Sequence, residues 1–262
     1  MRCPSKGNAM QTRIEGETLP VLYVSLDPWE SIVSETGELS WKSPNVTLQT
    51  TTAGAGSSGF LGAVKRSLAG GGLFMTQYKA EGGPGFIAFA TKIPGTIAEH
   101  RIEPGRSYML HRHGFMCATE GVTLGLGFQR SLGAGIFGGD GFRLQQVSGS
   151  GTFWTMLGGQ VVSHLLAPGE AIDVHPGHVG MFEDSVSFEI TMLPGIRNKL
   201  FGGDGFFLAR LTGPGQIWLQ TLTMPNLAHA LAPYLGSETV TSTAEGSALG
   251  VAASSFIRRA FE

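Results

Sequence analysis

The chain has 262 residues, a formal net charge of −2 at pH 7, 42% hydrophobic residues and only 15% charged ones. This combination excludes an intrinsically disordered chain, and the near-neutral charge argues against a protein that holds a nucleic-acid backbone. The 40 glycines and 13 prolines indicate a folded protein rich in turns, and the apolar runs are too short to span a bilayer.

The N-terminal segment, residues 1–10, contains Arg2 and Lys6 but no acidic residue and no apolar stretch typical of a secretory signal. We expect a disordered leader, with a targeting segment or an upstream start codon before Met10 as the alternatives. The two cysteines, Cys3 and Cys117, cannot form a disulfide framework and suit a reducing compartment, so we expect a cytoplasmic location.

Short β-rich segments follow along the chain. Residues 21–26, 186–190 and 217–221 alternate partly between apolar and polar side chains, and each is bounded by Gly, Pro or Asp. Turn signals every 8 to 12 residues predict a sandwich or barrel-like all-β fold. Helical patterns are limited to residues 60–68 and to residues 247–261, so we expect a short C-terminal helix.

An internal repeat organises these strands. The sequence Phe-Gly-Gly-Asp-Gly-Phe occurs at residues 137–142 and again at 201–206, and the same shift of 64 carries His111 onto His175. A more divergent copy lies upstream at a shift of 76, and each copy closes with a glycine turn, at residues 83–85, 149–151 and 213–215. We predict a single domain over residues 11–235, built of three repeats at about 11–93, 94–157 and 158–225, with 236–262 as linker and helix.

The chain resembles a known family at three places. These are Leu26-Asp27-Pro28-Trp29-Glu30 with Gly37, the repeated Phe-Gly-Gly-Asp-Gly-Phe, and the run from Leu211 to Thr221 that ends in Ile-Trp-Leu-Gln-Thr. Over about residues 11–225 it is similar to the mitochondrial-biogenesis family, named for a yeast altered-inheritance-of-mitochondria protein. Trp29 departs from the family, which usually has glycine there. The resemblance implies a fold like that of the trp RNA-binding attenuation protein, with three β-sandwich-like repeats in a pseudo-threefold arrangement. It implies no activity and no catalytic residues.

Histidines are the candidate metal ligands. His111 and His113 would point to the same face of a strand, and His175 is the repeat mate of His111. A cupin-like metal enzyme would add a carboxylate, for which Glu120 or Glu183 could serve. Against this, Arg112 lies between the two histidines, and Glu35 takes the matching position in the first repeat. The metal site is therefore one of two hypotheses.

The other hypothesis is a non-catalytic scaffold or binding protein that acts through oligomer or partner contacts. No GxSxG nucleophile elbow is present, and Cys117 lies in an apolar stretch, so the sequence favours a role other than an enzyme and implies no cofactor. Near-zero net charge favours self-association, so we expect a homo-oligomer and an unknown protein partner, for which a membrane-associated protein is one option. Lys and Arg are scattered, so no nucleic-acid partner is expected.

Overall fold

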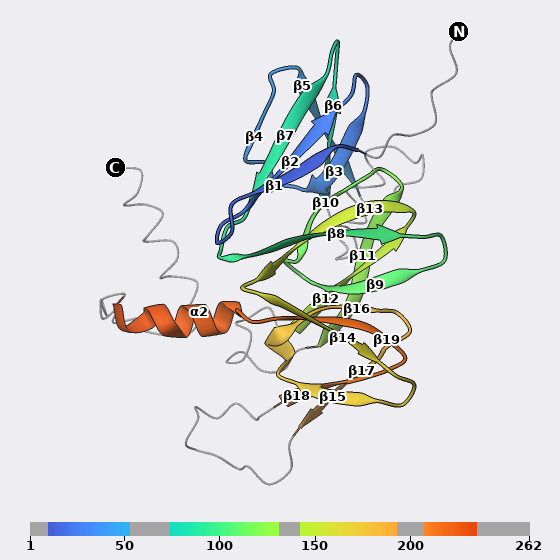
Figure 1. Cartoon of the computed structure of the whole chain (residues 1–262), viewed down its shortest axis with the longest axis vertical. Coiled ribbons are helices and arrows are strands. Elements are labelled where there is room, and N and C mark those ends of the chain that lie inside the picture. Colours follow the sequence, from blue (N-terminus) through green and yellow to red (C-terminus); the bar gives the residue numbers. More distant parts are fainter. Residues whose placement is uncertain (1–9, 53–73, 131–141, 193–206, 235–262) are drawn as a thin grey trace, which may run out of the picture.

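The computed structural model describes residues 10–52, 74–130, 142–192 and 207–234. Their regular structure is almost entirely antiparallel β, arranged in four sheets that we label A to D. In Figure 1, sheet A and the β5 and β6 end of sheet B lie side by side at the top, sheet C lies below them, and sheet D lies at the bottom. The all-β prediction is therefore confirmed.

Sheets A and B form the upper half of the molecule (Figure 1). Sheet A contains, in spatial order, β1 (Thr12–Glu15), β2 (Val21–Leu26), β7 (Gly85–Ala90) and β4 (Trp41–Lys42). Sheet B contains β5 (Val46–Thr52), β6 (Phe74–Ala80), β3 (Ser31–Glu35), β10 (Phe115–Ala118), β13 (Gly151–Gly158) and β8 (Gly95–Ile102).

Sheets C and D form the lower half. Sheet C contains, in spatial order, β11 (Val122–Arg130), β12 (Phe142–Gly149), β9 (Ser107–His111), β16 (Val179–Glu183), β19 (Gly215–Gln220) and β14 (Val161–Leu166). Sheet D contains β15 (Ala171–Val174), β18 (Phe207–Thr212) and β17 (Ser187–Met192). Each six-stranded sheet thus joins strands from two successive stretches of the chain, because β3 pairs with β10 in sheet B and β9 pairs with β16 in sheet C.

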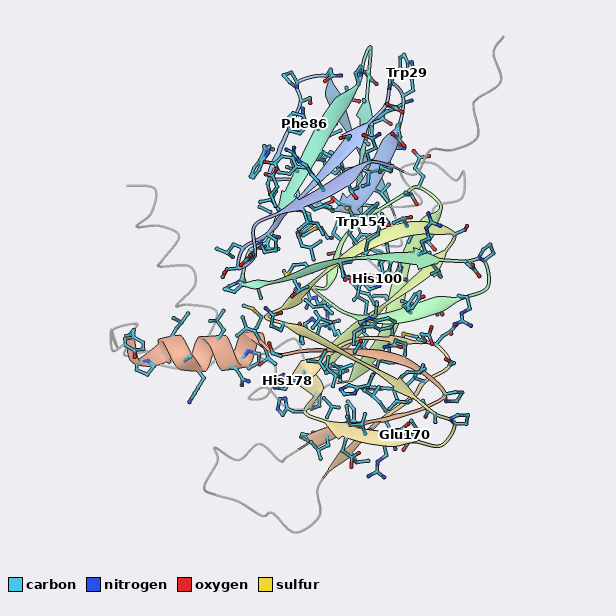
Figure 2. The ribbon with its side chains drawn as sticks, viewed as in Figure 1. Trp29, Phe86, His100, Trp154, Glu170 and His178 are labelled. Atoms are coloured by element: carbon cyan, nitrogen blue, oxygen red, sulfur yellow. The ribbon has the colours of Figure 1, made fainter. Side chains whose placement is uncertain are left out.

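Three apolar cores lie between the four sheets. Leu22 and Phe89 of sheet A pack with Trp154 of sheet B in the first core, which Figure 2 shows in the upper half of the molecule. The second core joins sheets B and C, and the third joins sheets C and D around Phe142 and Leu211. Full burial of one such side chain stabilises the fold by about 1.5–3 kcal/mol, so the β body is held by three separate apolar layers.

The predicted glycine turns carry the chain from one sheet to the next. Residues 83–85 connect β6 of sheet B to β7 of sheet A, 149–151 connect β12 to β13, and 213–215 connect β18 to β19. Gly149 needs glycine because its φ is +106° and a Cβ there would lie 2.2 Å from the carbonyl oxygen of Gly121. The repeated Gly-Gly-Asp-Gly segments, with Asp140 and Asp204, lie outside the described residues.

One α-helix, α2 (Met224–Leu231), is present in the described residues, together with the 3₁₀ turns η1 (Pro176–His178) and η2 (Ala232–Tyr234). Thr223 caps α2 by accepting a hydrogen bond from the backbone amide of Asn226 at 3.2 Å, and Pro225 lies in its first turn. None of the helices described is long and apolar enough to cross a membrane. The segments for which the sequence predicts helices, 60–68 and 247–261, lie outside the described residues, as do most of the leader and linker.

The pseudo-threefold arrangement stays a prediction. Its closure would require sheet D to pair with sheet A, and no strand pair among the described residues joins these two sheets. The three predicted strands are confirmed: β2 covers residues 21–26, and the segments 186–190 and 217–221 overlap β17 and β19.

Candidate functional site

A cleft of about 540 Å³ is bordered by strands of sheets B and C and by the segment that leads into α2. Its lining comes from widely separated parts of the chain: the end of β3, the segment before β8, the end of β9, the starts of β10 and β12, the end of β13, and the segment that leads into α2. This volume is in the range of small-molecule sites. Its lining residues are Glu35, Glu38, Lys92, Ile93, His111, Arg112, His113, Phe115, Phe142, Arg143, Met156, Gly158, Gly177, Gln220, Leu222, Thr223, Met224 and Pro225.

Glu35 is one of two partly buried carboxyl groups at this cleft, together with Glu38. It stands at the end of β3, where its Oε1 accepts a hydrogen bond from Nε2 of the buried Gln145 on β12. Burial raises the pKa of Glu35, although the Gln145 hydrogen bond and the positive charge of Arg112 oppose the shift. The protonated carboxyl is therefore favoured here more than in water.

Three cationic and two acidic side chains line the cleft. Lys92 forms an ion pair with Glu38 at 2.6 Å, which balances one cation with one carboxylate. Arg112 lies in the turn directly after β9 and Arg143 lies on the neighbouring β12, where the backbone amide of Arg112 donates to the carbonyl oxygen of Arg143 at 3.3 Å. Guanidinium groups stay charged at every physiological pH, whereas burial disfavours the charge of Glu35. The described lining therefore carries more positive than negative charge.

Two of the three predicted metal ligands, His111 and His113, line the cleft with ring centroids 6.1 Å apart. His111 is partly buried and His113 is exposed. Burial, assisted by the charges of His113 and Arg112, lowers the pKa of His111 to about 4, so its imidazole is neutral at pH 7.

His175, the third predicted ligand, is part of a different local structure. Its Nδ1 accepts a hydrogen bond from the amide of Gly177 at 3.3 Å, and its ring lies 5.9 Å from that of His178. Burial, with a smaller effect of His178, lowers the pKa of His175. Within the described part of the chain, no group of three or more His, Cys, Asp or Glu side chains is arranged to hold a metal ion. Binding of a metal by His111, His113 and His175 stays a prediction.

The two carboxylates considered with these histidines lie elsewhere in hydrogen-bonded positions. Glu120 accepts hydrogen bonds from Ser31 and Gln77, and it borders a separate, more open hollow beside Trp29. Glu183 pairs with Arg106 at 3.1 Å and accepts from the amide of Gln216 at 3.0 Å. Neither residue lines the cleft.

Gln220 fixes the wall of the cleft near α2. Its Nε2 donates to the carbonyl of Gly177 at 2.8 Å, and its Oε1 accepts from the amide of Gly158 at 2.9 Å. The carbonyl of Gln220 also bonds Nδ1 of His178 at 2.7 Å, at the turn seen beside the helix in Figure 2. The side chain therefore joins β13, η1 and β19, which gives the Gln220-Thr221 part of the sequence a structural role.

Sequence reasoning did not select Arg143 or Gln145 as candidates for the site, and it treated Arg112 only as an interruption between two histidines. A signal was available, since Arg112 and Arg143 each stand next to an aromatic or histidine residue in a chain with few charges. Cys117 is a free, buried thiol whose burial raises its pKa well above the ordinary value, as expected for a small apolar core residue.

Comparisons with known proteins agree with this fold. An uncharacterised protein of Streptococcus pyogenes serotype M6 is 26% identical over 220 residues, which cover 82% of this chain and 87% of the relative. An X-ray crystal structure of a protein from Streptococcus pyogenes matches with a TM-score of 0.68 and 23% identity, over 86% of this chain and 100% of that one. At this identity the match shows a shared fold. The family model described as "Mitochondrial biogenesis AIM24" matches residues 12–222, and the chain therefore belongs to this family.

Proposed function

We propose that this chain is a non-catalytic binding protein, a rigid β scaffold that binds a small amphipathic anion in its cleft and acts through contacts with further copies or partners. The observation that carries the ligand proposal is the pair Arg112 and Arg143 at a cleft with apolar walls. Phe115, Phe142 and Met156 offer an apolar surface for the body of such a ligand, and the guanidinium groups offer donors for a carboxylate or phosphate head.

A repeated architecture supports the scaffold proposal. Three strands of the middle third of the chain are matched by strands that begin 64 positions later: β9, β10 and β13 begin at Ser107, Phe115 and Gly151, and β15, β16 and β19 begin at Ala171, Val179 and Gly215. We infer three tandem units of the kind formed by the trp RNA-binding attenuation protein. Such units bury apolar surface against their neighbours and present a repeating surface to other molecules.

The ligand proposal is tested by calorimetry with octanoate, a carboxylate with a short apolar body. We expect saturable binding to the full chain, and at least tenfold weaker binding to the double variant Arg112→Gln/Arg143→Gln, because each charge-assisted hydrogen bond contributes about 1.5–3 kcal/mol and 1.4 kcal/mol is a factor of ten.

The matched control is Arg13→Gln/Arg101→Gln, which removes the same charge at two exposed positions outside the cleft. It should bind octanoate as the unchanged chain does. Equal binding of octanoate by both double variants, or equally tight binding of uncharged octanol by the unchanged chain, contradicts an anion site in this cleft.

A histidine-based metal site is the second candidate, favoured by the position of His111 and His113 in the same cleft. Neutral imidazole is the form that binds metals, and the lowered pKa of His111 keeps it neutral at pH 7. Glu35 at the same cleft could add a carboxylate oxygen. The metal content of the purified protein separates the two candidates.

A further inference from the structure

Two strand pairs join successive stretches of the chain, and both use the same register. In sheet B, β3 and β10 run antiparallel with Ser34 opposite Cys117. In sheet C, β9 and β16 run antiparallel with Leu110 opposite Met181. Leu110 lies 76 positions after Ser34, and Met181 lies 64 positions after Cys117, so the second junction repeats the first by the two shifts found in the sequence.

The outer sheets each end in a strand that corresponds to one side of these junctions. Sheet D has the spatial order β17, β18, β15, and sheet B begins with the matching order β5, β6, β3. The edge strand β15 of sheet D therefore corresponds to β3 of sheet B. Sheet A ends in β4, which stands beside β7 as β10 stands beside β13. Within the described residues, β15 pairs only with β18 and β4 pairs only with β7. The two edges lie at opposite ends of the molecule (Figure 1).

We propose that β15 of one copy pairs antiparallel with β4 of a second copy, which joins sheet D of the first to sheet A of the second. Repetition of the internal register places Val174 opposite Trp41 and Asp173 opposite Lys42, because Val174 follows Leu110 by 64 positions and Trp41 precedes Cys117 by 76. The assignment rests on the copy-to-copy contacts of the proposed function and does not depend on the ligand of the cleft.

The side chains at this predicted junction are complementary. Asp173 is exposed and is held by Arg210 of the same chain, whose guanidinium donates to both carboxylate oxygens at 2.8 and 2.7 Å. Lys42 is partly exposed, and an ammonium group directly opposite this carboxylate would add a cross-strand charge pair. Trp41 is 43% exposed, whereas Cys117, which takes the matching place at the internal junction, is fully buried. Pairing would cover the Trp41 side chain in the same way.

The surface around Trp41 also suits an interface. Tyr23 packs its ring 5.9 Å from that of Trp41 and 6.2 Å from that of Phe86, whose side chain is 41% exposed. Figure 2 places Phe86 on the upper part of the molecule, on sheet A. Exposed aromatic groups beside an open strand edge are typical of association surfaces, and an uncovered edge otherwise invites aggregation.

A contact between two different edges is head-to-tail, so each added copy leaves one β15 and one β4 edge open. The expected products are therefore rings or open chains of copies, and a twofold dimer that uses one edge twice is not expected. Pairing of β15 with β4 of the same chain, and pairing with a strand of another protein, are alternatives that the experiment distinguishes.

Disulfide trapping tests the register. In a Cys3→Ser background of the full chain, protein with Trp41→Cys is mixed with protein with Val174→Cys and oxidised. Opposed residues of antiparallel strands have Cα atoms about 4.5–5.5 Å apart, which suits a disulfide. We expect covalent dimers in the mixture and none in either protein alone. A chain that carries both changes should give a ladder of covalent multimers.

The matched control replaces Val174→Cys by Asp173→Cys, whose side chain points to the other face of the strand. It should form far fewer cross-links with Trp41→Cys. If the doubly substituted chain forms only an internal disulfide at monomer mass, β15 and β4 pair within one chain and the proposal is overturned.

A charge exchange tests the same junction without cysteines. Lys42→Asp should weaken self-association by about threefold or more in sedimentation velocity at low salt. Asp173→Lys should weaken it too, but it also breaks the pair with Arg210, so the double variant should restore the association only in part. If the protein is an oligomer that forms no such cross-links and is unaffected by the charge exchange, the β15–β4 junction is wrong, although the expectation of a homo-oligomer holds. A chain that is monomeric at all concentrations contradicts both.

Discussion

The side-chain amide of Gln145 donates a hydrogen bond to the carboxyl of Glu35, which joins β12 of sheet C to β3 of sheet B across 110 positions of the chain. The side-chain carbonyl oxygen of Gln145, Oε1, is buried and has no hydrogen-bond partner among the described residues. The hydrogen bond from Gln145 thus fixes the partly buried carboxyl group of Glu35 at the wall of the cleft.

Glu35→Gln should make the fold more stable than the unchanged chain at pH 8, with a smaller difference at pH 4. The pKa of Glu35 is raised in the folded state, so the carboxyl contributes stability below its unfolded pKa and this contribution is lost as the pH rises through the folded value. A neutral amide removes that loss. Urea unfolding at both pH values measures the difference in unfolding free energy between Glu35→Gln and the unchanged chain. Glu38→Gln is the control, because it removes a carboxyl of the same cleft that is paired with Lys92. Equal pH dependence in Glu35→Gln and the unchanged chain contradicts the shift.

We expect His100 to lower the free energy of unfolding as the pH falls below 6.5. Its ring stacks on Phe153 at 5.1 Å between sheets B and C, in the middle of the molecule in Figure 2, and burial lowers its pKa to about 4. The unfolded chain takes up a proton near pH 6.5, so between pH 6.5 and pH 4 it binds more protons than the folded chain and stability declines.

His100→Gln should therefore reduce the loss of unfolding free energy between pH 7.5 and pH 5 by about 1–2 kcal/mol, in addition to a general destabilisation at both pH values. The matched control is His164→Gln, which changes the exposed histidine 64 positions later on β14. If both variants keep the full pH dependence, His100 is not the group responsible.

Trp29→Gly should stabilise the fold by roughly 0.5–1 kcal/mol. Trp29 has a φ of +71°, the one positive value at a residue other than glycine in the described residues, and side chains with a Cβ adopt this region at a cost of about 1–2 kcal/mol. Glycine's greater freedom in the unfolded chain removes part of the gain. Trp29→Ala loses the same contact with Lys79 but keeps the Cβ, and thermal or urea unfolding should rank it below Trp29→Gly. Equal stability of the two variants means that the backbone is not strained there.

Protein purified without chelator should carry no stoichiometric metal if the cleft takes an anion. If the histidines instead hold a metal, elemental analysis should find it in the unchanged chain, and His111→Ala/His113→Ala should lose it while the fold survives. His164→Ala serves as the control because it is exposed and lies outside the cleft. Metal bound equally by the unchanged chain and the double variant excludes His111 and His113 as its ligands.

The elements that the sequence predicted well are those with a local pattern. Residues 21–26 alternate because one face of β2 packs on the first core, where Leu22 and Val24 are fully buried. The glycine turns were predictable for the same reason, since a residue such as Gly149 is required by its own backbone conformation and by one close neighbour. The short helix α2 was missed, although Thr223 and Pro225 are typical of a helix start.

The cleft was less predictable because its residues meet only through strand pairing. Glu35 and Gln145 carry no mutual signal in the sequence, and their contact depends on the order of sheets B and C. His111 and His113 both line the cleft, but they do not share a strand face as predicted, because β9 ends at His111 and His113 lies in the turn after it. His175, chosen as a repeat mate, is engaged with Gly177 and His178. Repeat position therefore predicted the strand on which a residue lies better than it predicted the site to which that residue contributes.

Sheets B and C each serve two cores at once, and this has a consequence for how the protein loses its structure. Removal of β10 from β3 would strip sheet B of half its strands and weaken the cores on both of its faces. Heat or urea should therefore unfold the described β body in one cooperative transition. A destabilising substitution in sheet A should lower the unfolding free energy of sheet D as well. Fragments cut near residues 93 or 157 should fail to fold alone, so a chain of this kind gains or loses whole units in evolution only if the neighbouring sheet is completed by another unit.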